Sequence, residues 1–254
     1  MSTVYTAEEI VLLREGGRRL ASVLHEVAQS VRPGITTLEL DHIAERLIRQ
    51  YGDTPSFLHY KPEGARFPYP RSLCVSVNNE VVHGIPGPRV LEEGDIVGLD
   101  LGITHKGLVT DMAVTVPVGA IDEATKKLID VTREALVVGI AAARGGARVG
   151  DIGEAIETFV KPHGYGVIEV LGGHGVGHKV HEDPYIPNVG RKGTGPILKP
   201  GQVLALEPML NEGSKEVYLD DDGYTFKTAD DKRSAHFEHT ILVTSGEPEI
   251  LTKL

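Results

Sequence analysis

The chain has 254 residues, and its 26 Lys and Arg against 36 Asp and Glu give a net charge of −10. This length accommodates one large domain or two closely packed halves, but no long modular array. The negative charge argues against non-specific binding to nucleic acids or anionic membranes, because both need clustered Lys and Arg. Cys74 has no cysteine partner, residues 1–30 lack a signal-peptide layout, and no apolar run is long enough to cross a membrane. We therefore expect a cytoplasmic protein without a membrane span.

Two helices are expected at the start of the chain. Thr6 and Glu9 form a capping box before an amphipathic pattern over residues 7–30. A second box, Thr36 with Glu39, opens another amphipathic pattern. Each box satisfies backbone N–H groups that a helix leaves unpaired at its first turn, so we predict a helix after each one.

A long loop and three strands are expected next. Residues 53–71 are rich in Pro, Gly and aromatic side chains, and loops of this length are commonly functional or mobile. The segments LCVSVNNEVV (73–82), DIVGLDLGI (95–103) and LVTDMAVTV (108–116) are short, rich in β-branched residues and bounded by Gly and Pro. This pattern is typical of strands.

The second half of the chain repeats this order. A helical pattern begins at Asp122, a Gly-Gly break follows, a further helix is expected over about 150–161, and VLALEPML and FEHTILVT are predicted strands. A shift of about 112 positions aligns residues 33–48 with 145–160. This indicates a weak internal duplication of two α+β halves joined near 117–122, although two amphipathic helices can also match by chance.

Carboxylates within apolar strands are the most informative feature of the sequence. Asp100 and Asp111 interrupt two strands that a short turn connects. A hairpin turn centred between His105 and Lys106 places the two aspartates directly opposite each other, with Cβ atoms about 4.5–5.5 Å apart. Opposed like charges destabilise a sheet, so this arrangement favours a bound cation. The alternative is a turn displaced by one residue, with one aspartate facing solvent.

Further residues strengthen the hypothesis of a metal site. Glu207 and Glu238 also lie in apolar strands, and charged residues are rarely buried without a partner. Imidazole is the commonest metal ligand, and the candidate histidines are His83 and, in GGHGVGHKVHEDP, His174, His178 and His181. Taken singly, however, a histidine is more often a surface or hydrogen-bonded core residue than a ligand. Such an oxygen-rich set suits a pair of Mn, Fe, Co or Zn ions that promote amide hydrolysis better than it suits structural zinc or calcium.

These residues lie in motifs that resemble those of the methionine aminopeptidases of the shorter, type I form, in the pita-bread metallopeptidase family. The similarity runs over nearly the whole chain, and the motifs follow the family's order. They are YTAEEIVLLREGGR, SVNNEVVHGIP, DIVGLDLGITHKGLVTD, GGHGVGHKVHEDP, LEPML and SAHFEHTILVT. The ordered set is far more specific than any single motif.

The resemblance implies an α+β, pseudo-twofold pita-bread fold, in which two α+β halves with antiparallel sheet enclose a dinuclear metal site. We expect one catalytic domain over residues 1–254, with pseudo-repeat halves of about 1–118 and 122–254. The implied cofactor is two divalent ions, drawn from Co, Mn, Fe or Zn. The implied activity is metal-dependent removal of N-terminal methionine from nascent proteins and peptides.

The resemblance also implies roles for single residues. The metal ligands would be Asp100, Asp111, His174, Glu207 and Glu238, with Asp111 and Glu238 bridging. Glu207 would also accept a proton from the nucleophilic water. His181 resembles the histidine that steadies the tetrahedral intermediate, and His83 the one that contacts the substrate near the scissile amide. His178 matches no ligand and is expected to be structural.

A substrate pocket is implied as well. Besides His83 and His181, it would include Tyr60, Phe67, Cys74 and Tyr224. Several positions depart from the family pattern, and the departures are Val82 for Cys, Met112 for Thr, Tyr224 for Trp, His236 for Gln, and Tyr60-Lys61-Pro62 with a longer loop through Pro70 for Tyr-His-Gly. None removes a ligand, but they leave the side-chain preference open.

Two alternatives remain. A Xaa-Pro aminopeptidase or dipeptidase of the same fold would share the metals and mechanism, although those relatives usually carry an additional N-terminal domain and this chain starts directly at the catalytic unit. A non-catalytic binding module would be expected to have lost ligands, yet all five are present. The expected partners are the N-termini of nascent polypeptides and peptides, with ribosome proximity left open. No nucleic-acid or membrane binding is expected, and a monomer is the default.

Overall fold

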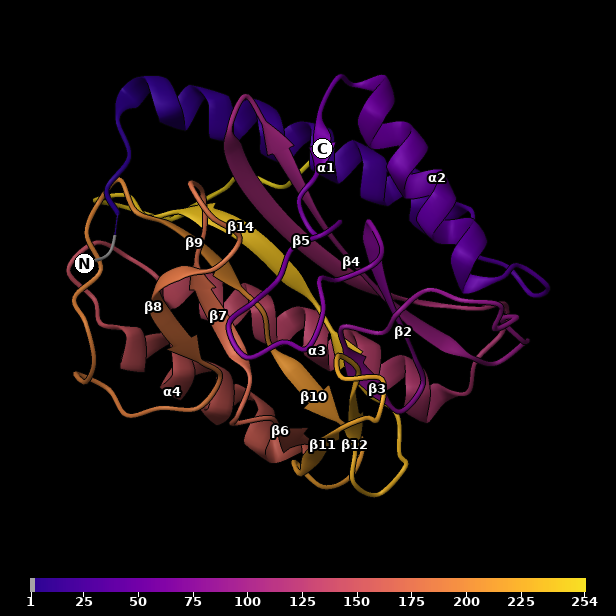
Figure 1. The fold of residues 1–254 in the computed structure, drawn as a ribbon. Helices are drawn as coiled ribbons and strands as arrows, with labels where there is room; N and C mark the ends of the chain where they lie inside the picture. The colour runs from indigo at the N-terminus through magenta and orange to yellow at the C-terminus, as the bar shows by residue number, and fades with distance from the viewer. Residues whose placement is uncertain (1–2) are drawn as a thin grey trace.

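The computed structural model describes residues 3–254 (Figure 1). The helices are α1 (Ala7–Gln29), α2 (Thr37–Gln50), α3 (Glu123–Ala142), α4 (Val149–Val160) and the short 3-10 helix η1 (Lys161–His163). The strands of the first half are β1 (Thr54–Pro55), β2 (Leu73–Val77), β3 (Glu80–Val82), β4 (Ile96–His105) and β5 (Leu108–Pro117). Those of the second half are β6 (Gly166–Val167), β7 (Gly172–Gly175), β8 (Glu182–Pro187), β9 (Val203–Leu206), β10 (Met209–Asn211), β11 (Val217–Leu219), β12 (Phe226–Thr228), β13 (Ser234–His236), β14 (Glu238–Leu242) and β15 (Glu249–Ile250).

The predicted helix starts are confirmed. Thr6 and Thr36 are the N-caps of α1 and α2, and both predicted capping boxes form with Glu9 and Glu39. The predicted strands are also present, but some are divided. The segment LCVSVNNEVV splits into β2 and β3, which belong to different sheets, and VLALEPML splits into β9 and β10 around Glu207.

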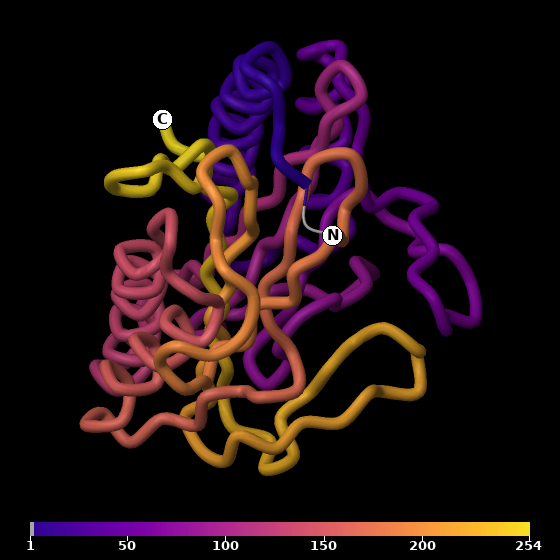
Figure 2. The backbone as a smooth tube through the Cα atoms, turned by 90° about the vertical axis from the view of Figure 1, so that its left-hand side faces the viewer, coloured from indigo at the N-terminus to yellow at the C-terminus, as the bar shows by residue number. Residues whose placement is uncertain are grey.

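One antiparallel sheet of nine strands organises the molecule. Its main path runs β1-β4-β5-β14-β9-β7-β8, with β2 paired to β4 and β15 paired to β14. Helix α1 packs on β4 and β5, α3 packs on α4, and α4 contacts β8. Figure 2 shows α1, α3 and α4 on one side, and the loops near residues 60 and 220 on the opposite side. The face that carries these loops is therefore the one left open for a site.

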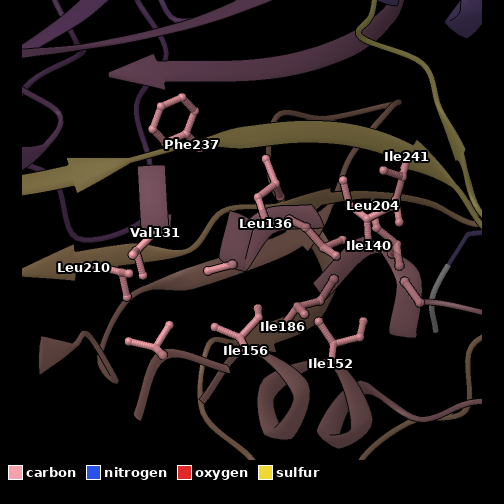
Figure 3. Close-up of a cluster of buried hydrophobic side chains, with 14 of the residues drawn as sticks. Val131, Leu136, Ile140, Ile152, Ile156, Ile186, Leu204, Leu210, Phe237 and Ile241 are labelled. Atoms are coloured by element: carbon pink, nitrogen blue, oxygen red, sulfur yellow. The ribbon is translucent and has the colours of Figure 1, made fainter. Parts of the chain in front are cut away.

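Two hydrophobic cores anchor the sheet. One joins α1 and α2 to β2 and β4, and includes Leu20, Leu40 and Leu99. The other joins α3 and α4 to the strands of the second half, and Figure 3 shows Leu136 and Ile152 among its members. Each pair of helices therefore packs on the sheet through its own apolar cluster, on the side opposite the open face. No helix in residues 3–254 combines the length and apolarity needed to cross a bilayer.

Equivalent backbone contacts recur before α2 and α4. Gly34 and Gly146 both have φ of +89°, a left-handed conformation that glycine adopts without steric cost. The Gly34 amide donates to the carbonyl of Leu91 at 2.8 Å, and the Gly146 amide donates to the carbonyl of Leu198 at 2.8 Å. The shift of about 112 positions seen in the sequence thus relates the two donor glycines, whose acceptors Leu91 and Leu198 lie 107 positions apart.

The β4–β5 hairpin differs from its prediction in register. The turn is centred on Lys106 and Gly107, which both have positive φ, as a two-residue type I′ turn requires. Asp100 therefore lies opposite Ala113, and Asp111 lies opposite Gly102. The predicted direct pairing of the two aspartates is wrong. Because the displacement moves each partner by two positions, both aspartates still point to the same face of the sheet.

Candidate active site

Five neighbouring strands deliver the five predicted metal ligands. In sheet order, Asp100 lies on β4, Asp111 on β5, Glu238 at the start of β14, Glu207 directly after β9, and His174 on β7. Each strand contributes one donor to the open face. The sheet therefore gathers into one site residues that are widely separated along the chain.

Small residues keep space free between the donors. Ala113 pairs with both Asp100 and Glu238, so these two carboxylates flank an alanine in one row of the sheet. Ala205 pairs with His174 in the next strand along. A larger side chain at either alanine would occupy the face on which the donors converge.

The donor atoms lie close enough to share an ion. One ligand atom each of Asp111, His174 and Glu238 lies within 4.8 Å of the others. Within the described part of the chain, Asp100 Oδ1 and Glu238 Oε1 are buried without a hydrogen-bond partner. Unpartnered buried carboxylate oxygens are costly, so this site fits a cation.

The carboxyl groups resist ionisation when no ion is bound. Burial, with Asp111 as a further cause, raises the pKa of Asp100 well above its usual range, and burial raises the pKa of Asp111 to about 7. Burial and the charge of Asp111 raise the pKa values of Glu207 and Glu238 as well. A divalent ion would remove this repulsion, because it supplies the opposite charge that four clustered acids lack.

His174 is prepared to act as a nitrogen ligand. Its Nδ1 lies 2.9 Å from the carbonyl oxygen of Gly175, and a carbonyl can only accept, so Nδ1 carries the hydrogen. Burial lowers the pKa of His174 to about 3, which keeps the ring neutral at physiological pH. The remaining atom, Nε2, lies 3.5 Å from Glu207 Oε1 and has a free lone pair to offer.

The metal-free protein should lose stability as the pH rises above about 6.5. Burial lowers the pKa values of His83 and His174 to about 4 and 3, so their contribution increases with pH only up to the unfolded value of 6.5. Raised carboxyl pKa values act in the opposite sense, because the folded state then binds more protons than the unfolded state. Each carboxyl costs about 1.4 kcal/mol per pH unit while it is protonated only in the folded state.

Thermal unfolding of chelator-treated protein at pH 6.5 and pH 8.5 tests this expectation. The unfolding midpoint should fall at the higher pH, and Glu238→Gln should show a smaller fall because it removes one of the four acids. A midpoint that is equal or higher at pH 8.5 would contradict the account.

A cavity of about 80 Å³ opens beside the five donors. Of the predicted substrate residues, His83, His181, Tyr60, Cys74 and Tyr224 line it. Phe67 does not line it: its side chain is 40% exposed, and its ring packs edge-on against Tyr224 with centroids 5.3 Å apart. Phe57, Tyr69 and Val180, which were not predicted from the sequence, also contribute to the apolar wall. The cavity is thus an aromatic-lined pocket with the carboxylates at one side.

Two tyrosine hydroxyls hold the loop around residue 60 over this cavity. The Tyr60 hydroxyl lies 3.0 Å from His181 Nδ1, and the Tyr224 hydroxyl donates to the backbone carbonyl of Phe67. The His181 ring also packs edge-on against His174, with centroids 4.5 Å apart. The loop is therefore tied both to the histidine-rich segment and to the opposite wall.

His83 and His236 complete the surroundings of the carboxylates. His83 has φ of +60°, a left-handed conformation that is uncommon for a residue other than glycine and is often found at functional sites. His236, which the sequence analysis noted only as a departure from the family pattern, is buried, and its Nε2 lies 3.6 Å from Glu207 Oε2. Glu207 thus lies between two histidine rings, those of His174 and His236.

Comparison with known proteins identifies the family. The model of metallopeptidase family M24 matches residues 11–245. The chain belongs to metallopeptidase family M24. Among its curated relatives, the methionine aminopeptidase of Clostridium perfringens is 48% identical over 244 residues, with 96% of each chain covered. Methionine aminopeptidase 1 of Bacillus subtilis is 47% identical, with 98% of each chain covered.

Solved structures of similar proteins support the same fold. The methionine aminopeptidase of Rickettsia prowazekii matches with a TM-score of 0.96 and 37% identity over the whole of both chains. The prolidase of Pyrococcus furiosus matches with a TM-score of 0.77 at 22% identity, over 99% of this chain and 65% of that one. The α+β pita-bread fold is therefore confirmed, and the prolidase likeness concerns the fold alone. As a member of this metallopeptidase family, the protein depends on divalent metal.

Proposed function

We propose that this protein is a methionine aminopeptidase, which hydrolyses the first peptide bond of nascent proteins and peptides to release N-terminal methionine. The single observation that carries the proposal is the convergence of five donors beside an aromatic-lined cavity. Such a cavity is suited to bind one apolar side chain. Binding of the first side chain there would hold the first peptide bond next to the donors. The full-length similarity to methionine aminopeptidases also favours this activity over the prolyl peptidases.

We infer that the site holds two divalent ions. The ligands would be Asp100, Asp111, His174, Glu207 and Glu238, with Asp111 and Glu238 bridging. When bound, the ions would polarise the scissile carbonyl and make the attacking water more acidic. Mn, Fe, Co and Zn all accept such a ligand set, and their availability would decide among them.

The remaining chemistry belongs to side chains of this protein. Glu207 accepts the proton of the attacking water and passes it toward the leaving amine. His83 donates to the substrate near the scissile amide, and His181 stabilises the oxyanion of the tetrahedral intermediate. If the Tyr60 hydroxyl donates to His181 Nδ1, Nε2 of that ring is left as the donor that this role needs. Tyr60, Cys74 and Tyr224 surround the first side chain, and Phe67 supports Tyr224 from outside.

We further infer that residues 1–254 form one catalytic domain of two pseudo-repeat halves, about 1–118 and 122–254. The matching contacts of Gly34 and Gly146 support this division. The substrates are N-termini of polypeptides, and the chain is proposed to act as a cytoplasmic monomer. Proximity to the ribosome would fit a nascent substrate. The net charge of −10 argues against direct contact with nucleic acid.

Release of the first amino acid from Met-Gly-Gly and Ala-Pro-Gly tests the proposal. The purified protein, loaded with Mn or Co, should release methionine from the first peptide, and a chelator should stop the reaction. Cleavage only before proline would assign the sister activity instead. No cleavage of either peptide with metal bound would revive a binding role.

Replacing His181 with Ala should leave metal content unchanged and lower kcat by about 10²-fold, because one donor to the developing oxyanion is lost. Elemental analysis of the purified variant, together with steady-state kinetics on Met-Gly-Gly, separates the two effects. His178→Ala is the matched control: its side chain is 49% exposed and contacts Glu9 at 2.8 Å. Loss of metal from His181→Ala would show that His181 is a ligand instead.

A further inference from the structure

A second cleft, of about 420 Å³, opens on the other side of the donors. It shares four lining residues with the first cavity, and these are His83, His174, His181 and Glu207. The two hollows therefore meet at the proposed reaction centre. No member of the loop near residue 60 lines this second cleft, whereas Tyr60 and Pro62 of that loop line the first cavity.

The direction of the substrate follows from this junction, on the basis of the proposed function. If the first side chain fills the first cavity, the scissile bond lies at the four shared residues. The rest of the polypeptide must then leave through the second cleft. The second residue contains the scissile nitrogen and therefore stays near the junction. An extended chain rises about 3.3 Å per residue, so the third residue lies about that distance further along the cleft.

Two exposed apolar side chains line the part of the cleft that the substrate would enter beyond the junction. Val170 is 71% exposed and Tyr185 is 51% exposed, and both line the cleft. The Tyr185 hydroxyl donates to the carbonyl of Glu169 at 3.5 Å, so its ring lies against the segment that carries Val170. Tyr185 and the junction residue Glu207 line the same cleft, and burial and the charge of Glu207 raise the pKa of Tyr185.

The charged side chains that line the cleft are acidic. Glu182 and Asp183 line it, and among its lining residues in the described part of the chain there is no Lys or Arg. An acidic side chain bound there would approach these two carboxylates. We therefore expect the cleft to select substrate side chains by their charge as well as by their polarity.

We propose that Val170 and Tyr185 form a binding surface for the third residue of the substrate, which favours an apolar side chain and disfavours an acidic one. The contribution of this surface should be modest, since both side chains are open to solvent. Covering part of one Leu side chain should raise kcat/KM by about fivefold over Ser.

The test compares Met-Ala-Leu-Gly, Met-Ala-Ser-Gly and Met-Ala-Asp-Gly with Mn-loaded full-length protein. For the wild type, kcat/KM should be highest with Leu and lowest with Asp. The double variant Val170→Ser, Tyr185→Ala should bring the Leu-to-Ser ratio close to one. The matched control is Val137→Ser, Tyr218→Ala, which changes a valine and a tyrosine of 52% and 46% exposure elsewhere and should keep the wild-type ratio.

The outcomes separate this inference from the proposed function. Equal kcat/KM for the three peptides in the wild type, or a Leu-to-Ser ratio that survives the Val170 and Tyr185 changes, would overturn the third-residue surface while methionine release itself stands. If the wild type released no methionine from the dipeptide Met-Ala or from any of the tetrapeptides, the proposed function would fail, and this inference with it.

Discussion

Asp111→Asn is expected to abolish metal retention and methionine release together. Asp111 lies at the centre of the donor set: it belongs to the group with His174 and Glu238, and its side chain contacts that of Asp100. The amide keeps the shape of the side chain but removes the charge that the proposed metal ligand would supply. Activity should fall by at least about 10³-fold, because an ion at such a site supplies several kcal/mol of charge stabilisation.

Thermal unfolding with and without Mn distinguishes a metal effect from misfolding. An ion present at 100 times its Kd stabilises the wild type by about 2.7 kcal/mol, which raises the midpoint by about 5–10 °C. Asp111→Asn should lose this rise. Its metal-free form should be at least as stable as the metal-free wild type, because the change relieves repulsion among buried acids.

Asp53→Asn is the matched control for a buried aspartate outside the site. Asp53 is 6% exposed, and it accepts from His105 Nδ1 at 2.8 Å and pairs with Arg19. Removing its charge should lower the unfolding midpoint of both forms but preserve the response to Mn. If Asp111→Asn kept the Mn response, Asp111 would not be a ligand.

The acidic residues of the site could be predicted from the sequence because a charged side chain inside an apolar strand needs an explanation. Asp100, Asp111 and Glu238 could be recognised from their strands alone, and local turn chemistry then decided the register. Lys106-Gly107 forms the turn because Gly107 takes φ of +87° without strain, a choice that the alternation of residues in the strands does not reveal. The error shifted the partners of both aspartates but not the face they share.

The order of the strands in the sheet lay beyond the sequence pattern. Glu238 lies in the same row as Asp100 only because β14 inserts between β5 and β9, and no local pattern encodes that long-range pairing. The cavity wall was missed for a similar reason. Phe57 and Tyr69 are buried in a segment that the sequence predicts only as a long loop, and the folded loop is needed to show that their rings line the cavity.

Glu207→Gln should lower kcat by about 10²- to 10⁴-fold, the usual contribution of a general base. Glu207 is the one proposed carboxylate ligand that lines both cavities, so it lies where the scissile bond is expected. Its backbone is held in place by Asn188, whose side-chain amide donates to the Glu207 carbonyl at 3.1 Å. Gln preserves the packing between His174 and His236 but cannot accept the proton of the attacking water.

A metal titration separates the two roles assigned to Glu207. Kinetics on Met-Gly-Gly are measured at rising Mn concentration, with bound metal determined in parallel, and Glu247→Gln, whose side chain is 85% exposed, serves as the control. We expect Glu207→Gln to bind metal more weakly yet to stay inactive at saturation, because occupancy cannot replace a proton acceptor. Full recovery of kcat at high Mn would reduce Glu207 to a ligand and move the base elsewhere in the site.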